Sequence, residues 1–142
     1  MIPAAFEYKA PTSVDEALQL LAEGGDDAKI IAGGQSLLPV MKLRLAAPEL
    51  LIDLAKIDLL KGVRDAGDAI VIGAMTPHFE VVRDPLVAEH ASLIARCVET
   101  VADPQVRHRG TIGGACAHAD PAGDLPAPMV ALDAEFVIAG SG

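Results

Sequence analysis

The sequence predicts an α+β fold in two parts, a small parallel α/β subdomain over residues 1–54 and a mixed antiparallel α+β subdomain over residues 55–142. Two observations support this prediction. The first part alternates apolar and amphipathic segments in the order strand, helix, strand, helix, strand, which is typical of parallel strands joined by right-handed crossovers. After residue 54 the pattern changes to a hairpin, several helices and a last strand, so we place the domain boundary there.

The first two elements are a short edge strand at residues 6–10 and a helix at residues 13–25. The helix opens with a capping box, because Ser13 can cap it and Glu16 follows three residues later. The Gly24-Gly25 pair supplies its end. Its apolar residues fall on one face of the helix: Val14, Ala17, Leu18 and Leu21.

The rest of the first subdomain is predicted from its apolar runs. Residues 28–33 and 50–54 read as buried strands, because each is short and almost wholly apolar. Between them, residues 36–45 read as a short helix with Ser36 as its N-cap and Pro39 in its first turn.

The second subdomain opens with a hairpin at residues 61–75 about a turn at residues 66–68. Thr76 is expected to cap a helix that begins with Pro77. From there to residue 102 the chain reads as mostly helical, with a break near Asp84-Pro85. The remaining segments are predicted as a polar loop (103–110), an irregular stretch (111–124), a helix (125–134) and a strand (135–140).

The composition narrows the class of function. Hydrophobic residues make up 51% of the 142 residues, which is typical of a packed domain rather than a disordered tail. The net charge of −9 argues against a nucleic-acid surface and against an anionic membrane surface. No apolar window approaches the roughly 20 residues of a spanning helix, and the N-terminus lacks a signal-peptide pattern. We therefore expect a cytoplasmic protein.

Cysteine and histidine spacing predicts neither a metal site nor a nucleophile. Cys97 and Cys116 form no CxxC pair, and free thiols are favoured over a disulfide, which the sequence leaves open. Two cysteines are too few for an iron–sulfur cluster held by this chain alone. No histidine pair has ligand-like spacing within one helix, and no GxSxG elbow is present. Two methionines, Met41 and Met75, read as core residues.

The clearest candidate binding motif is Gly33-Gly34-Gln35-Ser36, between a predicted strand and a predicted helix. Glycine backbone with a helix start behind it can gather N–H groups around an anion. The motif is neither GxGxxG nor GxxxxGK[ST], so nucleotide hydrolysis is disfavoured and a held diphosphate suits it better. Taken alone, the pair is more often only a turn.

A second pair, Gly113-Gly114, follows Thr111 and two arginines. It is either a loop packed closely under a helix or a second contact with the same ligand. The nearby Asp120 and Asp124 could act as acid and base, bind a metal or bind a sugar hydroxyl. Aspartates beside Pro and Gly more often cap turns and helices, and Asp124 stands where an N-cap of the next helix belongs.

At this level of detail the chain resembles a known family. The segments AGGQSLLPVMKLRLAAPELLIDL, IGAMT, VRHRGTIGGACAHADPAGDLPA and ALDAEF resemble the FAD-binding medium subunit of molybdenum hydroxylases, and most closely its aerobic carbon monoxide dehydrogenase group. The resemblance covers essentially the whole chain. It implies the two-subdomain fold of vanillyl-alcohol oxidase-like (PCMH-type) flavoproteins, with FAD as cofactor extended between the two subdomains.

The resemblance also implies which residues bind FAD. The diphosphate is expected on residues 31–37, a second segment at residues 110–115 is expected to contribute, Ala74 and Val101 to line the flavin cavity, and Asp124 to lie near the ribityl and adenosine part. No catalytic residue and no metal ligand is implied. The full set of implied cofactor-binding residues is Ile31, Ala32, Gly33, Gly34, Gln35, Ser36, Leu37, Ala74, Val101, Gly110, Thr111, Gly113, Gly114, Ala115 and Asp124.

The sequence departs from the family pattern at two points. Ala115 stands where relatives often carry Asn or Ser, so a side-chain hydrogen bond of about 1 kcal/mol is lost while the backbone N–H is expected to remain. The chain is also shorter than family subunits, and we expect an N-terminal fragment with an incomplete second subdomain and no C-terminal domain. Its end is expected to expose an unpaired strand at residues 135–139.

The implied function is electron transfer within a hetero-oligomer. Electrons would pass from a molybdenum-cofactor large subunit through an iron–sulfur small subunit to FAD and then to an acceptor. One alternative is a non-catalytic fragment or assembly module that binds FAD weakly or not at all. A self-contained flavin oxidase is a third reading, but the chain has no room for a substrate domain. The substrate and the acceptor are not readable from this chain.

Overall fold

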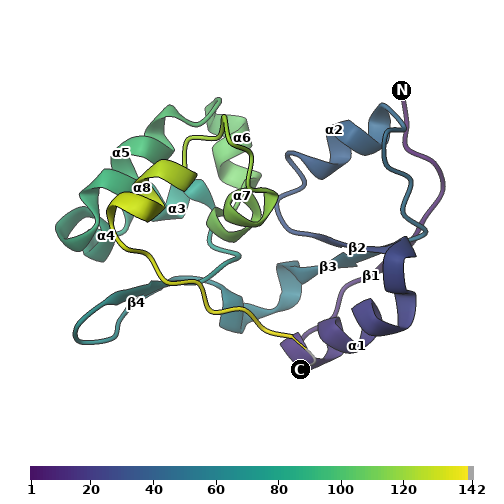
Figure 1. Cartoon of the computed structure of the whole chain (residues 1–142), viewed down its shortest axis with the longest axis horizontal. Helices are drawn as coiled ribbons and strands as arrows, with labels where there is room; N and C mark the ends of the chain where they lie inside the picture. Colours follow the sequence, from purple (N-terminus) through teal and green to yellow (C-terminus); the bar gives the residue numbers. More distant parts are fainter. Residues whose placement is uncertain (141–142) are drawn as a thin grey trace. The chain divides into compact units, whose positions relative to one another are not determined.

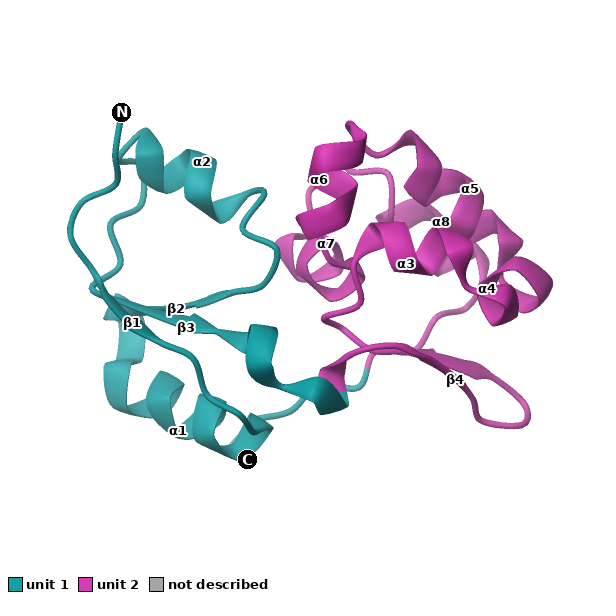
Figure 2. Cartoon of the chain, turned by 180° about the vertical axis from the view of Figure 1, so that it is seen from behind, with its two compact units in different colours: residues 1–59, 137–142 teal, residues 60–136 magenta. Residues whose placement is uncertain are grey.

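The computed structural model describes residues 1–140. The chain divides into two compact units, one formed by residues 1–59 with the segment from Val137 onward, the other by residues 60–136 (Figure 2). The fold class predicted from the sequence is confirmed, because a parallel sheet comes first and an antiparallel hairpin with helices follows. The boundary predicted between residues 54 and 55 stays a prediction.

Within the described residues, the first unit is a three-stranded parallel sheet with one helix on each face (Figure 1). The central strand β3 (Leu50–Asp53) lies between β1 (Glu7–Lys9) and β2 (Ala28–Ile31). The chain passes through α1 (Val14–Gly24) from β1 to β2, then returns through α2 (Leu37–Lys42) to β3. Because the two crossovers run in opposite directions across the sheet, their helices cover opposite faces.

The predicted capping of α1 by Ser13 is confirmed, whereas the Glu16 carboxylate of the predicted capping box binds the Thr12 N–H and not that of Ser13. The Ser13 Oγ accepts a hydrogen bond from the Glu16 N–H at 3.2 Å, and the Glu16 carboxylate accepts one from the Thr12 N–H at 2.9 Å. The helix ends at Gly25, whose φ of 54° favours glycine. The buried core of this unit consists of Ala17, Ala28, Met41, Leu51, Ile52 and Ile57.

The prediction that β2 is a buried strand is wrong for its middle residues. Lys29 is exposed and Ile30 keeps 42% of its surface accessible. The reason is the sheet order β1-β3-β2, which makes β2 an edge strand, whereas β3 is flanked on both sides.

The second unit begins with the predicted hairpin, β4 (Val63–Asp65) paired antiparallel with β5 (Ile70–Ile72). At its turn, Gly67 adopts a φ of 92° and its N–H donates to the Asp65 carboxylate at 2.7 Å. The helices that follow are α3 (His78–Arg83), α4 (Pro85–His90), α5 (Ser92–Thr100), α6 (Pro104–Arg109), α7 (Ile112–His118) and α8 (Pro126–Ala131).

Helix α5 lies at the centre of this unit and packs against α3, α4 and α8. The buried cluster around it is aliphatic, consistent with the scarcity of aromatic residues. Its members are Val81, Val87, Ala91, Ile94, Val98, Ile112, Leu125 and Met129. Outside this unit's core, the chain also forms short 3-10 helices at Gly25–Asp27, Leu54–Lys56 and Asp58–Leu60.

Two predictions of irregular structure are wrong. Residues 104–109 form α6, because the Asp103 carboxylate caps its start by accepting from the Val106 N–H at 2.9 Å and Pro104 occupies the first helical position. Residues 112–118 form α7, where the Thr111 hydroxyl accepts from the Gly114 N–H at 3.1 Å. In both places a capping residue outweighed a polar or glycine-rich sequence.

Three further predictions are corrected at element ends. Pro77 is the N-cap of α3 and not its first helical residue, while Thr76 donates its hydroxyl to the Gly62 carbonyl at 3.2 Å. The N-cap of α8 is Leu125 rather than Asp124. Residues 135–140 form no strand, because none of the strands in the described part of the chain pairs with them. Among residues 1–140, no helix combines the length and the apolar content that crossing a bilayer requires.

Candidate functional site

The first glycine segment, residues 31–37, connects β2 to α2 in the first unit. Ile31 is the last residue of β2, and the chain then turns so that the Leu38 N–H donates to the Gly34 carbonyl at 3.1 Å. Gly34 has a φ of 75°, and a Cβ at this position would lie 3.0 Å from the Leu38 Cδ1. The turn therefore requires glycine both for its backbone angle and for the space around it.

The backbone donors of this segment are free. Among residues 1–140, no protein group accepts a hydrogen bond from the N–H of residues 33–37. Ser36 is the N-cap residue of α2 as predicted, but its hydroxyl makes no capping hydrogen bond. Gln35 and Ser36 are both exposed, and the segment carries no acidic side chain. Consecutive unpaired N–H groups beside a free hydroxyl are the donor set that an anion requires.

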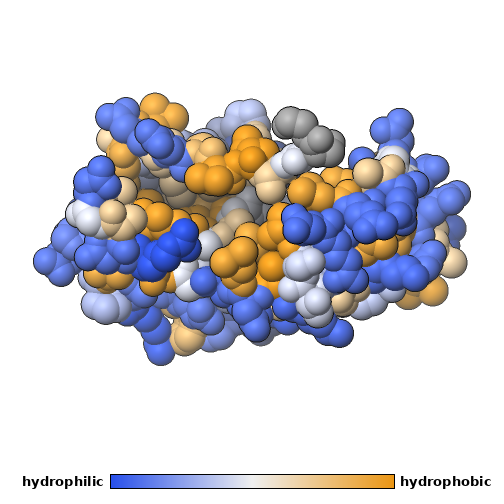
Figure 3. All heavy atoms as spheres, turned by 90° about the horizontal axis from the view of Figure 1, so that it is seen from below, coloured by the Kyte–Doolittle hydropathy of each residue, from blue (hydrophilic) through white to orange (hydrophobic). Residues whose placement is uncertain are grey.

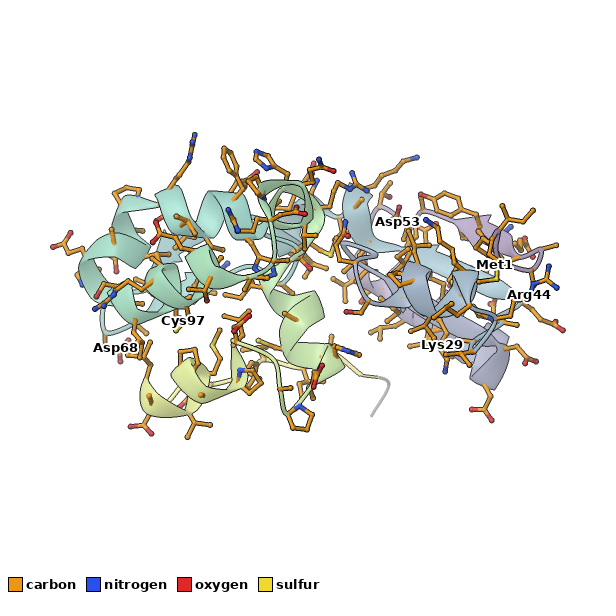
Figure 4. The ribbon with its side chains drawn as sticks, turned by 90° about the horizontal axis from the view of Figure 1, so that it is seen from above. Met1, Lys29, Arg44, Asp53, Asp68 and Cys97 are labelled. Atoms are coloured by element: carbon orange, nitrogen blue, oxygen red, sulfur yellow. The ribbon has the colours of Figure 1, made fainter. Side chains whose placement is uncertain are left out.

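Asp53 stabilises the strand ends beside this turn, although no motif in the sequence singles it out. Asp53, labelled in Figure 4, is the register partner of Ile31 in the parallel sheet. Its carboxylate accepts from the Tyr8 hydroxyl at 2.5 Å and from the Ala55 N–H at 2.8 Å. The hydrogen bond to Asp53 is the main cause that raises the pKa of Tyr8. Because both carboxylate oxygens are engaged, we assign Asp53 a structural role.

The second glycine segment, residues 110–115, lies against residues 74–78 in the second unit. The His78 N–H donates to the Gly110 carbonyl at 2.9 Å, the Ile112 N–H to the Thr76 carbonyl at 3.1 Å, and the Gly113 N–H to the Ala74 carbonyl at 2.9 Å. A Cβ on Gly113 would lie 2.6 Å from that same Ala74 oxygen. The fold therefore brings together Ala74 and Gly113, which are two of the residues predicted to bind the cofactor.

Unlike the first segment, the second has few free backbone donors. The Gly114 N–H donates to the Thr111 hydroxyl at 3.1 Å, and the Ala115 N–H to the Thr111 carbonyl at 3.1 Å. The expectation that the Ala115 N–H remains available is therefore wrong, because the start of α7 uses it. The absence of a Cβ at Gly110 and Gly113 leaves room for neighbouring protein atoms, the His78 ring and Ala74.

Val101 and Asp124 lie apart from this pairing. Val101 follows α5 and is half-buried, and its carbonyl accepts from the Arg107 guanidinium at 2.8 Å. Asp124 is exposed and makes no hydrogen bond within the described residues, so its carboxylate is free for a ligand. Asp120 accepts from the Ala122 N–H at 2.9 Å, which supports the turn interpretation of that residue.

Sequence reasoning missed His78, which lies under the second segment. Only 3% of its surface is exposed, and its Nδ1 is buried without a hydrogen-bond partner among residues 1–140. Burial, and next the Arg107 guanidinium, lower the pKa of His78. The spacing of the histidines carried no signal for this role, because the role depends on a contact with a residue far along the chain.

Neither cysteine forms a disulfide, in agreement with the interpretation from the sequence. Cys97 (Figure 4) and Cys116 are both half-buried free thiols, and burial raises the pKa of Cys116. Within residues 1–140, no group of three or more His, Cys, Asp or Glu side chains could hold a metal ion.

A family described as "FAD binding domain in molybdopterin dehydrogenase" matches residues 4–142. This chain belongs to that family. Its relatives are oxidoreductase subunits, and one of them, the carbon monoxide dehydrogenase medium chain of Hydrogenophaga pseudoflava, is 52% identical over 99% of this chain and 49% of its own length. Another, the 6-hydroxypseudooxynicotine dehydrogenase complex subunit alpha of Paenarthrobacter nicotinovorans, is 45% identical over 94% of this chain and 45% of its own length.

Solved structures of the family agree with the fold. Carbon monoxide dehydrogenase from Oligotropha carboxidovorans matches with a TM-score of 0.87 at 46% identity, over 89% of this chain and 44% of that chain. The Hydrogenophaga pseudoflava enzyme matches with a TM-score of 0.84 at 55% identity, over 85% of this chain and 42% of that chain. The chain spans about half the length of the curated relatives that it matches.

The first glycine segment fits the cofactor of this family. FAD carries a diphosphate, and a diphosphate requires N–H donors without competing carboxylates. Residues 33–37 supply such donors, and the positive φ of Gly34 allows the turn that exposes them.

Proposed function

We propose that this chain is the FAD-binding part of an electron-transfer subunit of a molybdenum hydroxylase. In the complete complex, electrons would pass from a molybdenum-cofactor large subunit through an iron–sulfur small subunit to FAD and then to an acceptor. Family membership supports FAD as the cofactor. The observation that carries the proposal in the structure is the run of free N–H groups at residues 33–37.

The residues of the first unit would hold the cofactor and do not react with it. The N–H groups of residues 33–37 donate to the diphosphate oxygens, and the Ser36 hydroxyl adds a further donor. Ile31, Ala32 and the Leu37 side chain flank the turn on β2 and α2. The set lacks the lysine and the acidic partner of a phosphate-cleaving loop, so the diphosphate is bound without being cleaved.

The residues of the second unit would shape the flavin surroundings. Ala74 and Val101 supply small apolar walls, and the backbone segment packed against Ala74 lines the same surroundings: Gly110, Thr111, Gly113, Gly114 and Ala115. Asp124 accepts a hydrogen bond from a hydroxyl of the ribityl or adenosine part. When bound, FAD supplies the electron-transfer chemistry, which no side chain of this chain provides. We therefore propose no catalytic residue.

The glycine turn can be tested by replacing Gly34 and measuring FAD affinity. In Gly34→Ala the positive φ is disfavoured and the new Cβ approaches Leu38, so the N–H groups shift. A hydrogen bond to a charged group is worth about 1.5–3 kcal/mol, so losing one lowers the affinity by about tenfold or more. Affinity is read from flavin absorbance retained after ultrafiltration.

Gly67→Ala is the matched control. Gly67 also has a positive φ, 92°, with nothing within 4 Å of a Cβ, and it lies in the β4–β5 turn away from the proposed cofactor residues. It should retain wild-type affinity. If both variants bind FAD like the wild type, the turn is not the diphosphate site. If the wild-type chain retains no flavin, the assembly-module alternative replaces the present proposal for this chain.

A further inference from the structure

His78 is a polar residue buried at a position where an apolar side chain would destabilise the fold less. It is the first residue of α3 and 3% exposed, whereas the other histidines, His90, His108 and His118, are exposed. A buried imidazole is destabilising unless its nitrogens are hydrogen-bonded, and the Nδ1 of His78 has no partner among residues 1–140. A leucine of similar size would avoid this penalty.

The ring of His78 lies directly against Gly110. A Cβ at position 110 would lie 2.9 Å from the Cδ2 and 3.3 Å from the Nε2 of the imidazole. The ring therefore occupies the space that any side chain at position 110 would need. The backbone of His78 also binds Gly110, through the 2.9 Å bond from its N–H to the Gly110 carbonyl.

This contact ends a short pairing of two backbone segments. Two more hydrogen bonds follow it, from Ile112 to Thr76 and from Gly113 to Ala74. The bridge between Pro77 and Thr111 belongs to the same pairing. Displacement of the ring would therefore act on the attachment of the whole segment 110–113.

The charges around His78 oppose its protonation. Arg107 of α6 is half-buried and is held by the carbonyls of Val101 and Ala102, so it cannot move away freely. The pairing segments, residues 74–77 and 110–113, carry no charge. Besides Arg107, Asp84 at the start of α4 and Cys97 of α5 are half-buried. The remaining ionisable side chains of α3, α4, α5 and α6 are exposed: Glu80, Arg83, Glu89, His90, Arg96, Glu99, His108 and Arg109.

We propose that His78 is the positioning residue of the second glycine segment. Its uncharged ring holds residues 110–113 against residues 74–78, and a proton on the ring releases them. The consequence for the flavin rests on the proposed function, because it requires that this segment and Ala74 belong to the cofactor site. The effect on the backbone does not.

Hydrogen exchange tests the positioning directly and needs no flavin. Amide protection factors of Ile112 and Gly113 are measured by NMR between pH 8 and pH 5 in the chain without FAD. Because the pKa of His78 is lowered by folding, protection is complete above the unfolded value of about 6.5 and falls about tenfold per pH unit below it. The fall ends at the folded pKa. The amide of Ile52 in β3 is the internal reference, since all four histidines lie in the other unit.

Variants then assign the proton to His78. His78→Leu should make the protection of Ile112 and Gly113 independent of pH, while His90→Leu, at an exposed site, should keep the wild-type dependence. The proposal is overturned if the wild type shows no such fall, or if His78→Leu keeps it. If His78→Leu does not fold, the pH titration of the imidazole resonances of wild-type His78 tests the proposal instead. Their midpoint must lie below 6.5, at the pH where the fall in amide protection ends, and a midpoint near 6.5 with no change at Gly110 overturns the proposal.

A flavin titration separates this inference from the proposed function. The wild type should bind FAD more weakly at pH 5.5 than at pH 7.5, in proportion to the fraction of molecules whose segment is released, and His78→Leu should bind equally at both. Unchanged wild-type affinity at a pH where exchange shows a substantial released fraction would contradict the link to the flavin. A chain that binds no FAD at any pH would contradict the proposed function, and the exchange result would still decide the role of His78.

Discussion

At the scale of single residues, the two glycine pairs look alike in sequence and differ in structure. Gly34 is required for its φ of 75°, and the N–H groups that follow it are free. Gly113 has no positive φ, and its N–H is bonded to the Ala74 carbonyl at 2.9 Å. Gly-Gly in a sequence indicates that a side chain is excluded. Whether a backbone angle or a neighbouring chain excludes it depends on tertiary contacts that the local sequence does not contain.

Gly113→Ala should strongly destabilise the second unit. The new Cβ would lie 2.5 Å from the Ala74 Cβ and 2.6 Å from its carbonyl oxygen, and backbone atoms cannot move aside cheaply. Overpacking of this kind costs about 1–3 kcal/mol, and here the hydrogen bond to Ala74 is also lost. The free energy of unfolding is measured by urea denaturation, with hydrogen exchange of the α5 amides as the probe of the second unit. Gly140→Ala, with nothing within 4 Å, is the control, and equal stability of the two variants would contradict the contact.

At the scale of elements, prediction succeeded where a cap and an apolar pattern agreed. In α1, Ser13, Glu16 and the apolar face all indicate the same helix, and the structure contains it. At α6 the Asp103-Pro104 cap indicates a helix, whereas the polar, arginine-rich composition indicates a loop. The structure follows the cap. The cap signal is the same as at Asp84-Pro85, where α4 begins. Residues 135–140 have the β-propensity of a strand, but they form none because a strand also requires a partner to pair with.

Asp103→Ala should weaken α6. Its carboxylate accepts from the Val106 N–H at 2.9 Å, and loss of such a cap costs about 0.5–2 kcal/mol. The loss is measured as a decrease in the free energy of unfolding of the second unit. Asp124→Ala is the control, because Asp124 is exposed and caps no helix, so its stability should match the wild type. A comparable loss in Asp124→Ala would restore the predicted N-cap role of that residue.

The candidate site is predicted from the family resemblance more than from residue chemistry. The pairing of Ala74 with Gly113 could not be derived from spacing, since the two residues come from distant segments that meet only in the fold. The free donors at residues 33–37 are expected from the strand–glycine–helix pattern, because the first N–H groups of a helix have no partner within it. His78 had no sequence signal, because its environment is made by Gly110 and Arg107.

At the scale of the whole molecule, large apolar side chains remain on the surface. Figure 3 colours hydrophobic residues orange, and several of them are exposed in this view. The most exposed run is in the segment after α8, where Phe136, Val137 and Ile138 are 59%, 99% and 86% exposed. These residues have high β-propensity, are consecutive, and pair with no strand among residues 1–140. An unpaired extended apolar segment is a site where a second chain can add a strand.

We therefore expect the chain to self-associate through residues 135–139, and we expect charge to suppress this association. The double variant Val137→Lys, Ile138→Lys should remain monomeric at concentrations where the wild type forms larger species, because strand addition would bring like charges on neighbouring chains together. Light scattering over a range of concentrations measures the association, and the unfolding midpoint should be unchanged because both side chains are exposed. Leu59→Lys, at an apolar position that is 77% exposed in a 3-10 turn, is the control for lost apolar surface alone. If Leu59→Lys suppresses association equally, general hydrophobic contact and not strand pairing drives it.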